Sequence, residues 1–107
     1  MDQSRLPLVK ALEQYIGENA LRQHMPGHKG GLGAPQPAQD LLGVKLWQAD
    51  VTEIAGLDDL QEPEGCIAEA QSLLADLYGA AASFFLINGS SVGIAASLLA
   101  CLQPGDE

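Results

Sequence analysis

The feature that most constrains the fold is a short apolar run that leads into a glycine turn. Residues 83–87 (Ser-Phe-Phe-Leu-Ile) are rich in strand-forming side chains and show no alternation between apolar and polar positions. Such a run predicts a strand covered on both faces, as in the parallel sheets of α/β proteins. Residues 88–91 predict a tight turn, and residues 92–102 predict a helix of small side chains. A parallel strand needs a partner, and the other candidate is a weak extended stretch at 50–54.

The rest of the chain predicts helices joined by glycine-rich loops. Apolar side chains at helical spacing predict a helix over residues 6–16 and another from about 63 to 78, which Gly79 ends. Residues 24–37 contain clustered glycine and proline and predict a loop. We therefore divide the chain into residues 1–38, a helix with a glycine-rich loop, and residues 39–107, the start of an α/β domain. Because the next strand is missing, the sequence resembles a piece of a larger protein.

Charge and composition exclude several classes of function. The 107 residues carry 14 acidic and five basic side chains, a net charge of −9, so we expect no nucleic-acid partner. The absence of a long apolar run and of a signal peptide predicts a cytoplasmic protein without membrane contact. Cys66 and Cys101 have no metal-ligand spacing and are interpreted as small core residues. His24 and His28 flank a Pro-Gly pair, which disfavours a helix between them. We therefore expect neither a shared helix face nor a metal site there.

The strongest chemical signal is the turn that contains Gly89, Ser90 and Ser91. It lies between the predicted strand and a helix, where free N–H groups and the helix dipole favour an anion. Glycine allows close approach of the backbone, and the two hydroxyls add donors, so the turn suits a phosphate monoester. The alternative is that Ser90 is an ordinary N-cap, and spacing alone slightly favours this second interpretation.

Two other segments admit a functional and a structural interpretation. The loop at 24–33 has four glycines beside His24, His28 and Lys29, and it could stack against a ligand or be a flexible connector. The acidic positions at 50–59, including Asp58 and Asp59, could attract a cation or be solvated surface. From the residues alone, the structural interpretation is favoured in both segments.

Four ordered blocks resemble the opening of the large domain of the ornithine/lysine/arginine decarboxylases. The blocks are His-Met-Pro-Gly-His-Lys-Gly-Gly at 24–31, Asp-Val-Thr-Glu-Ile-Ala-Gly-Leu-Asp-Asp-Leu at 50–60, Glu-Ala-Gln at 69–71 and Asn-Gly-Ser-Ser at 88–91. The resemblance covers residues 6 to 106. It implies a pyridoxal 5′-phosphate (PLP) enzyme of the aspartate-aminotransferase-like fold that removes CO₂ from arginine, lysine or ornithine to give an amine of polyamine biosynthesis.

The resemblance also implies roles for particular residues. Gly89, Ser90 and Ser91 would hold the cofactor phosphate, whereas Val92 could donate only its main-chain N–H. The loops would form the rim of the active site near the partner subunit of a homodimer or higher homo-oligomer, through His24, His28, Lys29, Asp58 and Asp59. The parent enzyme would bind a basic amino-acid substrate, and the groups that measure the length of its side chain are expected outside these residues.

The lysine that binds the cofactor covalently is expected in a Ser-x-His-Lys context downstream of these blocks. The only His-Lys pair here is at Lys29, preceded by Pro-Gly, and neither Lys10 nor Lys45 has a better context. We therefore expect no catalytic residue in these 107 residues and no activity from them alone. Two alternatives stay open: a truncated, non-catalytic interaction or dimerisation module, and an aldolase or aminotransferase reaction on the same fold.

Overall fold

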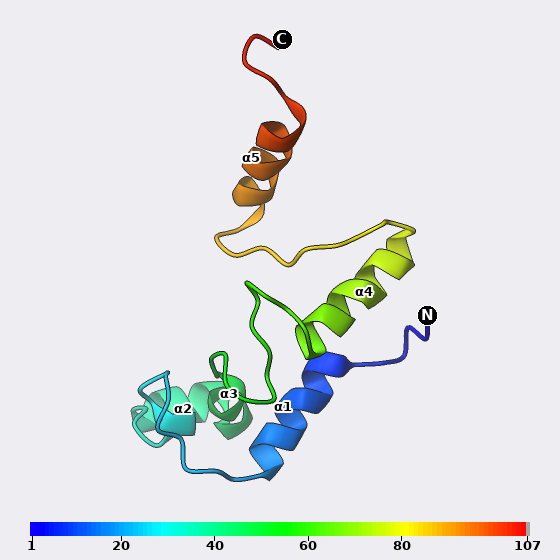
Figure 1. The fold of residues 1–107 in the computed structure, drawn as a ribbon. Helices are drawn as coiled ribbons and strands as arrows, with labels where there is room; N and C mark the ends of the chain where they lie inside the picture. Colours follow the sequence, from blue (N-terminus) through cyan, green and yellow to red (C-terminus); the bar gives the residue numbers. More distant parts are fainter. Residues whose placement is uncertain (107) are drawn as a thin grey trace.

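The computed structural model describes residues 1–106, and its regular structure there is helical (Figure 1). The elements, in chain order, are α1 (Pro7–Gly17), the single 3₁₀ turn η1 (Lys29–Gly31), α2 (Gln36–Leu42), α3 (Val44–Ala49), α4 (Cys66–Tyr78) and α5 (Ser90–Cys101). The predicted helices at 6–16, 63–78 and 92–102 are thus confirmed as α1, α4 and α5. Helices α2 and α3 were not predicted.

Helices α1 and α4 pack against each other and form most of the core. Tyr15 of α1 and Leu73 and Ala75 of α4 are buried, and Leu57 is buried from the loop that precedes α4. Burying one such leucine stabilises a fold by about 1.5–3 kcal/mol, so four buried side chains make a small core. This core holds α1 and α4 together and supports the loops beside them.

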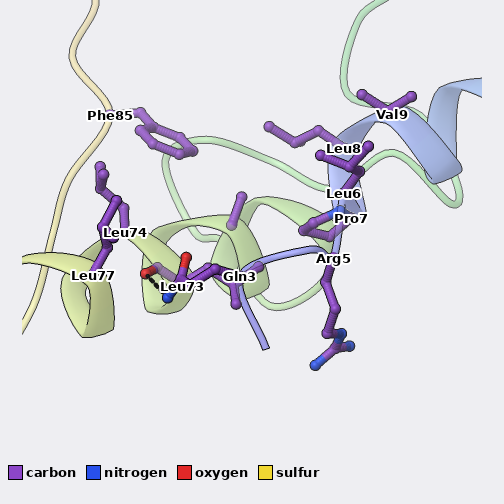
Figure 2. Close-up of a pocket in the computed structure, with 11 residues that line it drawn as sticks. Gln3, Arg5, Leu6, Pro7, Leu8, Val9, Leu73, Leu74, Leu77 and Phe85 are labelled. Atoms are coloured by element: carbon purple, nitrogen blue, oxygen red, sulfur yellow. Dashed lines mark hydrogen bonds between the residues drawn. The ribbon is translucent and has the colours of Figure 1, made fainter. Parts of the chain in front are cut away.

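The residues before α1 lie along α4 through polar contacts. The N-terminal ammonium group is 2.6 Å from Asp76 Oδ2, the Gln3 amide donates to the Leu73 carbonyl oxygen at 3.1 Å, and Arg5 pairs with Glu69. The hydrogen bond from the ammonium group, followed by the one from Gln3, lowers the pKa of Asp76. These contacts border an apolar groove of about 320 Å³ between the start of α1 and α4, which Phe85 closes on one side (Figure 2).

Helices α2 and α3 are short and depend on their neighbours. Helix α3 packs on η1, α2 and α1, and no side chain among residues 1–106 caps either short helix. Isolated helices of this length are marginal in water, so tertiary contacts supply their stability. That dependence explains why the local sequence at 41–54 predicted only a weak extended stretch.

The predicted strand at 83–87 is not formed in the described residues. The segment is extended, but no second strand lies beside it, and residues 50–54 are likewise without ladder hydrogen bonds. Phe84 is 76% exposed, while Ser83 Oγ donates to the Gln71 carbonyl oxygen of α4 at 2.6 Å. A strand requires inter-strand hydrogen bonds, so propensity alone leaves an extended loop here. The predicted α/β class is therefore not confirmed by residues 1–106, which are helix and loop.

Helix α5 stands apart from the other helices (Figure 1). The Cα radius of gyration is 17.7 Å, against about 13 Å for a compact domain of this length. Cys101 lies exposed on α5, so its interpretation as a core residue was wrong, whereas Cys66 is partly buried and burial raises the pKa of its thiol. In residues 1–106, no helix combines the length and the apolar character needed to cross a membrane.

Candidate cofactor-phosphate turn and the histidine loop

The turn before α5 is open and has unused donors. Gly89 is the N-cap of α5 with φ 78° and ψ 179°, a conformation that favours glycine, and a Cβ added there would meet open space. No side chain of the described residues caps this helix, and Ser90 and Ser91 are both exposed. The first turn of α5 thus combines free N–H groups with two exposed serines, and the start of a helix favours an anion.

The interpretation of Ser90 as an N-cap was wrong. Ser90 is the first residue of α5, and the capping position belongs to Gly89. Because glycine has no side chain, the hydroxyl that an N-cap serine would offer to the first-turn N–H groups is missing at this position. The assignment of Gly89, Ser90 and Ser91 to phosphate binding is untested by this geometry and stays a prediction.

His24 lies at the centre of a fixed local network. Tyr15 Oη lies 2.5 Å from His24 Nε2, and His24 Nδ1 lies 2.5 Å from the Met25 carbonyl oxygen. Because a carbonyl oxygen only accepts, Nδ1 donates to it, and in the neutral ring Nε2 then accepts from the tyrosine hydroxyl. Lys29 Nζ donates to the His24 carbonyl oxygen at 2.5 Å, which joins His24 and Lys29.

His28 has the opposite arrangement of its ring protons. The Gly31 N–H donates to His28 Nδ1 at 3.2 Å, so the proton of the neutral ring is assigned to Nε2, which donates to Asp50 Oδ2 at 3.1 Å. The ring of Trp47 packs edge-on against the His28 ring, and the two ring centres are 5.1 Å apart. Gly31 approaches Trp47 so closely that an added Cβ would lie 2.9 Å from the Trp47 Cβ. The loop therefore docks on α3 and is not a free connector.

Asp58 is engaged by backbone groups at the start of α4. Its two carboxylate oxygens accept N–H groups from residues 59, 64, 65, 67 and 68 at 2.8–3.3 Å. These hydrogen bonds, the one from Glu64 first, hold the pKa of Asp58 well below its usual range. Among the described residues, Asp59 accepts a hydrogen bond only from the Gln61 N–H, at 2.8 Å. The structure gives Asp58 a capping role, and a rim role for either acid stays a prediction.

The predicted site residues are not gathered in one place. His24 and Lys29 are in contact, and His28 lies in the same loop, but the start of α5 lies far from this loop (Figure 1). Within residues 1–106, no group of three His, Cys, Asp or Glu side chains is placed to hold a metal. All four ring nitrogens of the two histidines already contact protein groups.

The sequence interpretation missed Tyr15, Arg22 and Trp47. Tyr15 lies within the helix predicted at 6–16, and its hydroxyl orders His24, while the Arg22 guanidinium stacks over its ring at 4.8 Å from the ring centre. A tyrosine on the apolar face of a helix could have indicated a polar neighbour, because a buried tyrosine hydroxyl usually finds a hydrogen-bond partner.

Comparison with known proteins identifies the family. The family description "Orn/Lys/Arg decarboxylase, major domain" matches residues 6–107. The chain belongs to this family. The ordered blocks at 24–31, 50–60, 69–71 and 88–91 had predicted this membership, and the match confirms it.

Several curated proteins are similar to nearly the whole chain. The uncharacterized protein YaaO of Bacillus subtilis is 48% identical over 94% of the chain, and an arginine decarboxylase of Bacillus cereus is 38% identical over all of it. An ornithine decarboxylase of Haemophilus influenzae is 31% identical over 94%. The chain covers 21%, 23% and 15% of these proteins, so it spans about a fifth of their length or less. No solved structure matches.

Proposed function

We propose that this chain supplies the cofactor-phosphate turn of a PLP-dependent decarboxylase of basic amino acids. The family match supports decarboxylase chemistry, and the open turn at Gly89, Ser90 and Ser91 carries the cofactor assignment. When bound, PLP stabilises the negative charge that develops when the α-carboxylate departs as CO₂. The substrate is arginine, lysine or ornithine, and the setting is a cytoplasmic homodimer or higher homo-oligomer.

The role of this chain's own residues is to hold a phosphate without movement. The first-turn N–H groups of α5 and the Ser90 and Ser91 hydroxyls would donate to its oxygens, and Gly89 would let the backbone come close. The helix dipole adds a favourable field at this end. Because the breaking bond must stand perpendicular to the cofactor ring, a fixed phosphate limits rocking of the ring. The lysine that binds the cofactor is not supplied by Lys10, Lys29 or Lys45 in this proposal.

The test is a titration that compares PLP with pyridoxal, which lacks the phosphate. We expect PLP to shift the backbone amide resonances of Gly89, Ser90 and Ser91 in a ¹⁵N-labelled chain, and pyridoxal to leave them in place. The double variant S90A/S91A should weaken PLP binding at least about tenfold, because charge-assisted hydrogen bonds are strong.

Ser97→Ala is the matched control, since Ser97 is on α5 but donates to the Gly93 carbonyl oxygen at 2.8 Å. Equal shifts with pyridoxal, or equal losses in S97A and S90A/S91A, would contradict the proposed turn. Shifts confined to the loop at 24–33 would contradict it as well.

A further inference from the structure

A second pocket, far from the phosphate turn, combines positive charge with an apolar lining. It has a volume of about 650 Å³ and lies between the end of α1, η1 and α3. Its lining includes two of the chain's five basic side chains, Arg22 and Lys29, and the amides of Asn19, Gln39 and Gln48. The remaining lining residues are glycine or apolar, and none is a carboxylate, although the chain has 14 acidic residues.

Arg22 is held at this pocket without a carboxylate partner among residues 1–106. Its guanidinium lies 4.8 Å above the centre of the Tyr15 ring, and its Nη1 would be 3.1 Å from a Cβ added to Gly30. Nη1 is buried and has no hydrogen-bond partner in the described residues. Because Nη1 is closed off from solvent, an anion in the pocket would reach the guanidinium through its other N–H groups, and an oxyanion is the acceptor that a guanidinium pairs with best.

Lys29 adds a second cation at the same wall. Its Nζ donates one hydrogen bond to the His24 carbonyl oxygen, and an ammonium group has three N–H donors. The backbone of Lys29 has φ 52°, and Gly30 and Gly31 follow with φ 70° and 99°, so three successive residues in the left-handed region form the turn that presents it. Neither Lys29 nor Arg22 is within ion-pair distance of an acidic group in the part of the chain described.

We propose that the pocket of Arg22 and Lys29 binds a small organic anion through a carboxylate or phosphate group. The two cations and the amide donors take the charged end, while the apolar lining takes a hydrocarbon body. The volume falls within the roughly 300–1,000 Å³ of small-molecule sites. This site is separate from the turn at Gly89, and its assignment does not depend on the proposed PLP chemistry.

The test is a titration with malonate and, in parallel, with inorganic phosphate at constant ionic strength. Binding is followed through the single Trp47, whose Cβ faces Gly31 at the edge of the pocket, and through the amide resonances of Gly30 and Gly31. Arg22→Gln should raise the half-saturating concentration at least about tenfold, and Lys29→Gln should raise it about threefold or more.

Lys45→Gln is the charge-matched control, because Lys45 is exposed on α3 and does not line the pocket. It should change the half-saturating concentration less than twofold. A second variant, Gly30→Ala, keeps every charge but pushes the Arg22 guanidinium away, and it should also weaken binding. Gly79→Ala matches its backbone strain, with φ 63° and ψ 28° against φ 70° and ψ 23°, and has open space around the new methyl group.

Tighter binding of malonate would identify a carboxylate ligand, and tighter binding of phosphate would identify a phosphate ester. The proposal is overturned if neither probe binds, or if K45Q weakens binding as much as R22Q. Loss of PLP binding in S90A/S91A with unchanged malonate or phosphate binding here would confirm that the two sites are independent.

Discussion

Replacing Gly31 with alanine tests how tightly the histidine loop is fitted to α3. Two costs combine at this position. The backbone φ of 99° disfavours a side chain, at about 1–2 kcal/mol. The new Cβ would lie 2.9 Å from the Trp47 Cβ, and overpacking of this kind costs about 1–3 kcal/mol. Together the two terms lower the free energy of unfolding by about 2–5 kcal/mol.

Two other glycines separate these costs. Gly43 has φ 77° and ψ 148°, a conformation that is almost restricted to glycine, and it has open space around it, so Gly43→Ala carries only a backbone term of about 1–3 kcal/mol. Gly27 has neither a positive φ nor a close neighbour, so Gly27→Ala is expected to be neutral or to stabilise by up to about 1 kcal/mol. The expected order of stability is therefore G27A, then G43A, then G31A.

Urea unfolding followed by the fluorescence of Trp47 is a suitable assay, since Trp47 is the only tryptophan and lies at the contact in question. The clash involves the Trp47 Cβ, which alanine retains, so Trp47→Ala would not rescue G31A. A G31A chain as stable as G43A would refute the steric part of the reasoning. One as stable as G27A would refute both parts.

Three further outcomes follow from the structure. Asp58→Asn should reduce the helix content at neutral pH, and Asp59→Asn should not. Because the pKa of Asp58 is lowered in the folded chain, the Asp58 carboxylate stabilises the fold fully above the ordinary value of 3.8, and this contribution is lost as the pH falls below it. Circular dichroism from pH 7 to 2 would follow the loss. Incubation of the chain with PLP should give no lysine-bound absorbance band, and borohydride should leave Lys29 unlabelled; a trapped adduct there would disprove the exclusion of Lys29. The exposed apolar segment at 83–87 should make the purified chain oligomeric or poorly soluble, which sedimentation would detect as departure from a monodisperse monomer.

The helices that the sequence predicted correctly are those with strong local signals. Pro7 begins α1, while Gly79, with φ 63°, ends α4 and donates its N–H to the Asp76 carbonyl oxygen at 3.2 Å. The short helices α2 and α3 escaped prediction because α3 depends on contacts with η1 and α1, and α2 depends on contacts with α3. The predicted strand at 83–87 has no partner in residues 1–106, and propensity cannot supply one.

The candidate site was predictable in its residue types but not in its contacts. The sequence indicated the phosphate turn at Gly89–Ser91, and the structure adds that Gly89, rather than Ser90, is the cap. The five backbone N–H groups around Asp58 could not be foreseen, because they depend on how the loop at 59–65 folds back over α4. The division of the chain at residues 38 and 39 stays a prediction.

The uncovered connection between α4 and α5 has a consequence for handling the protein. Proteases bind their substrates as extended strands, and residues 80–88 already have extended or irregular backbone, with Phe84 76% and Leu86 51% exposed. Chymotrypsin should therefore cut first near Phe84 and release α5, while the α1–α4 pair resists for longer. Any ligand or subunit that covers this connection could therefore be detected because it would slow that first cleavage.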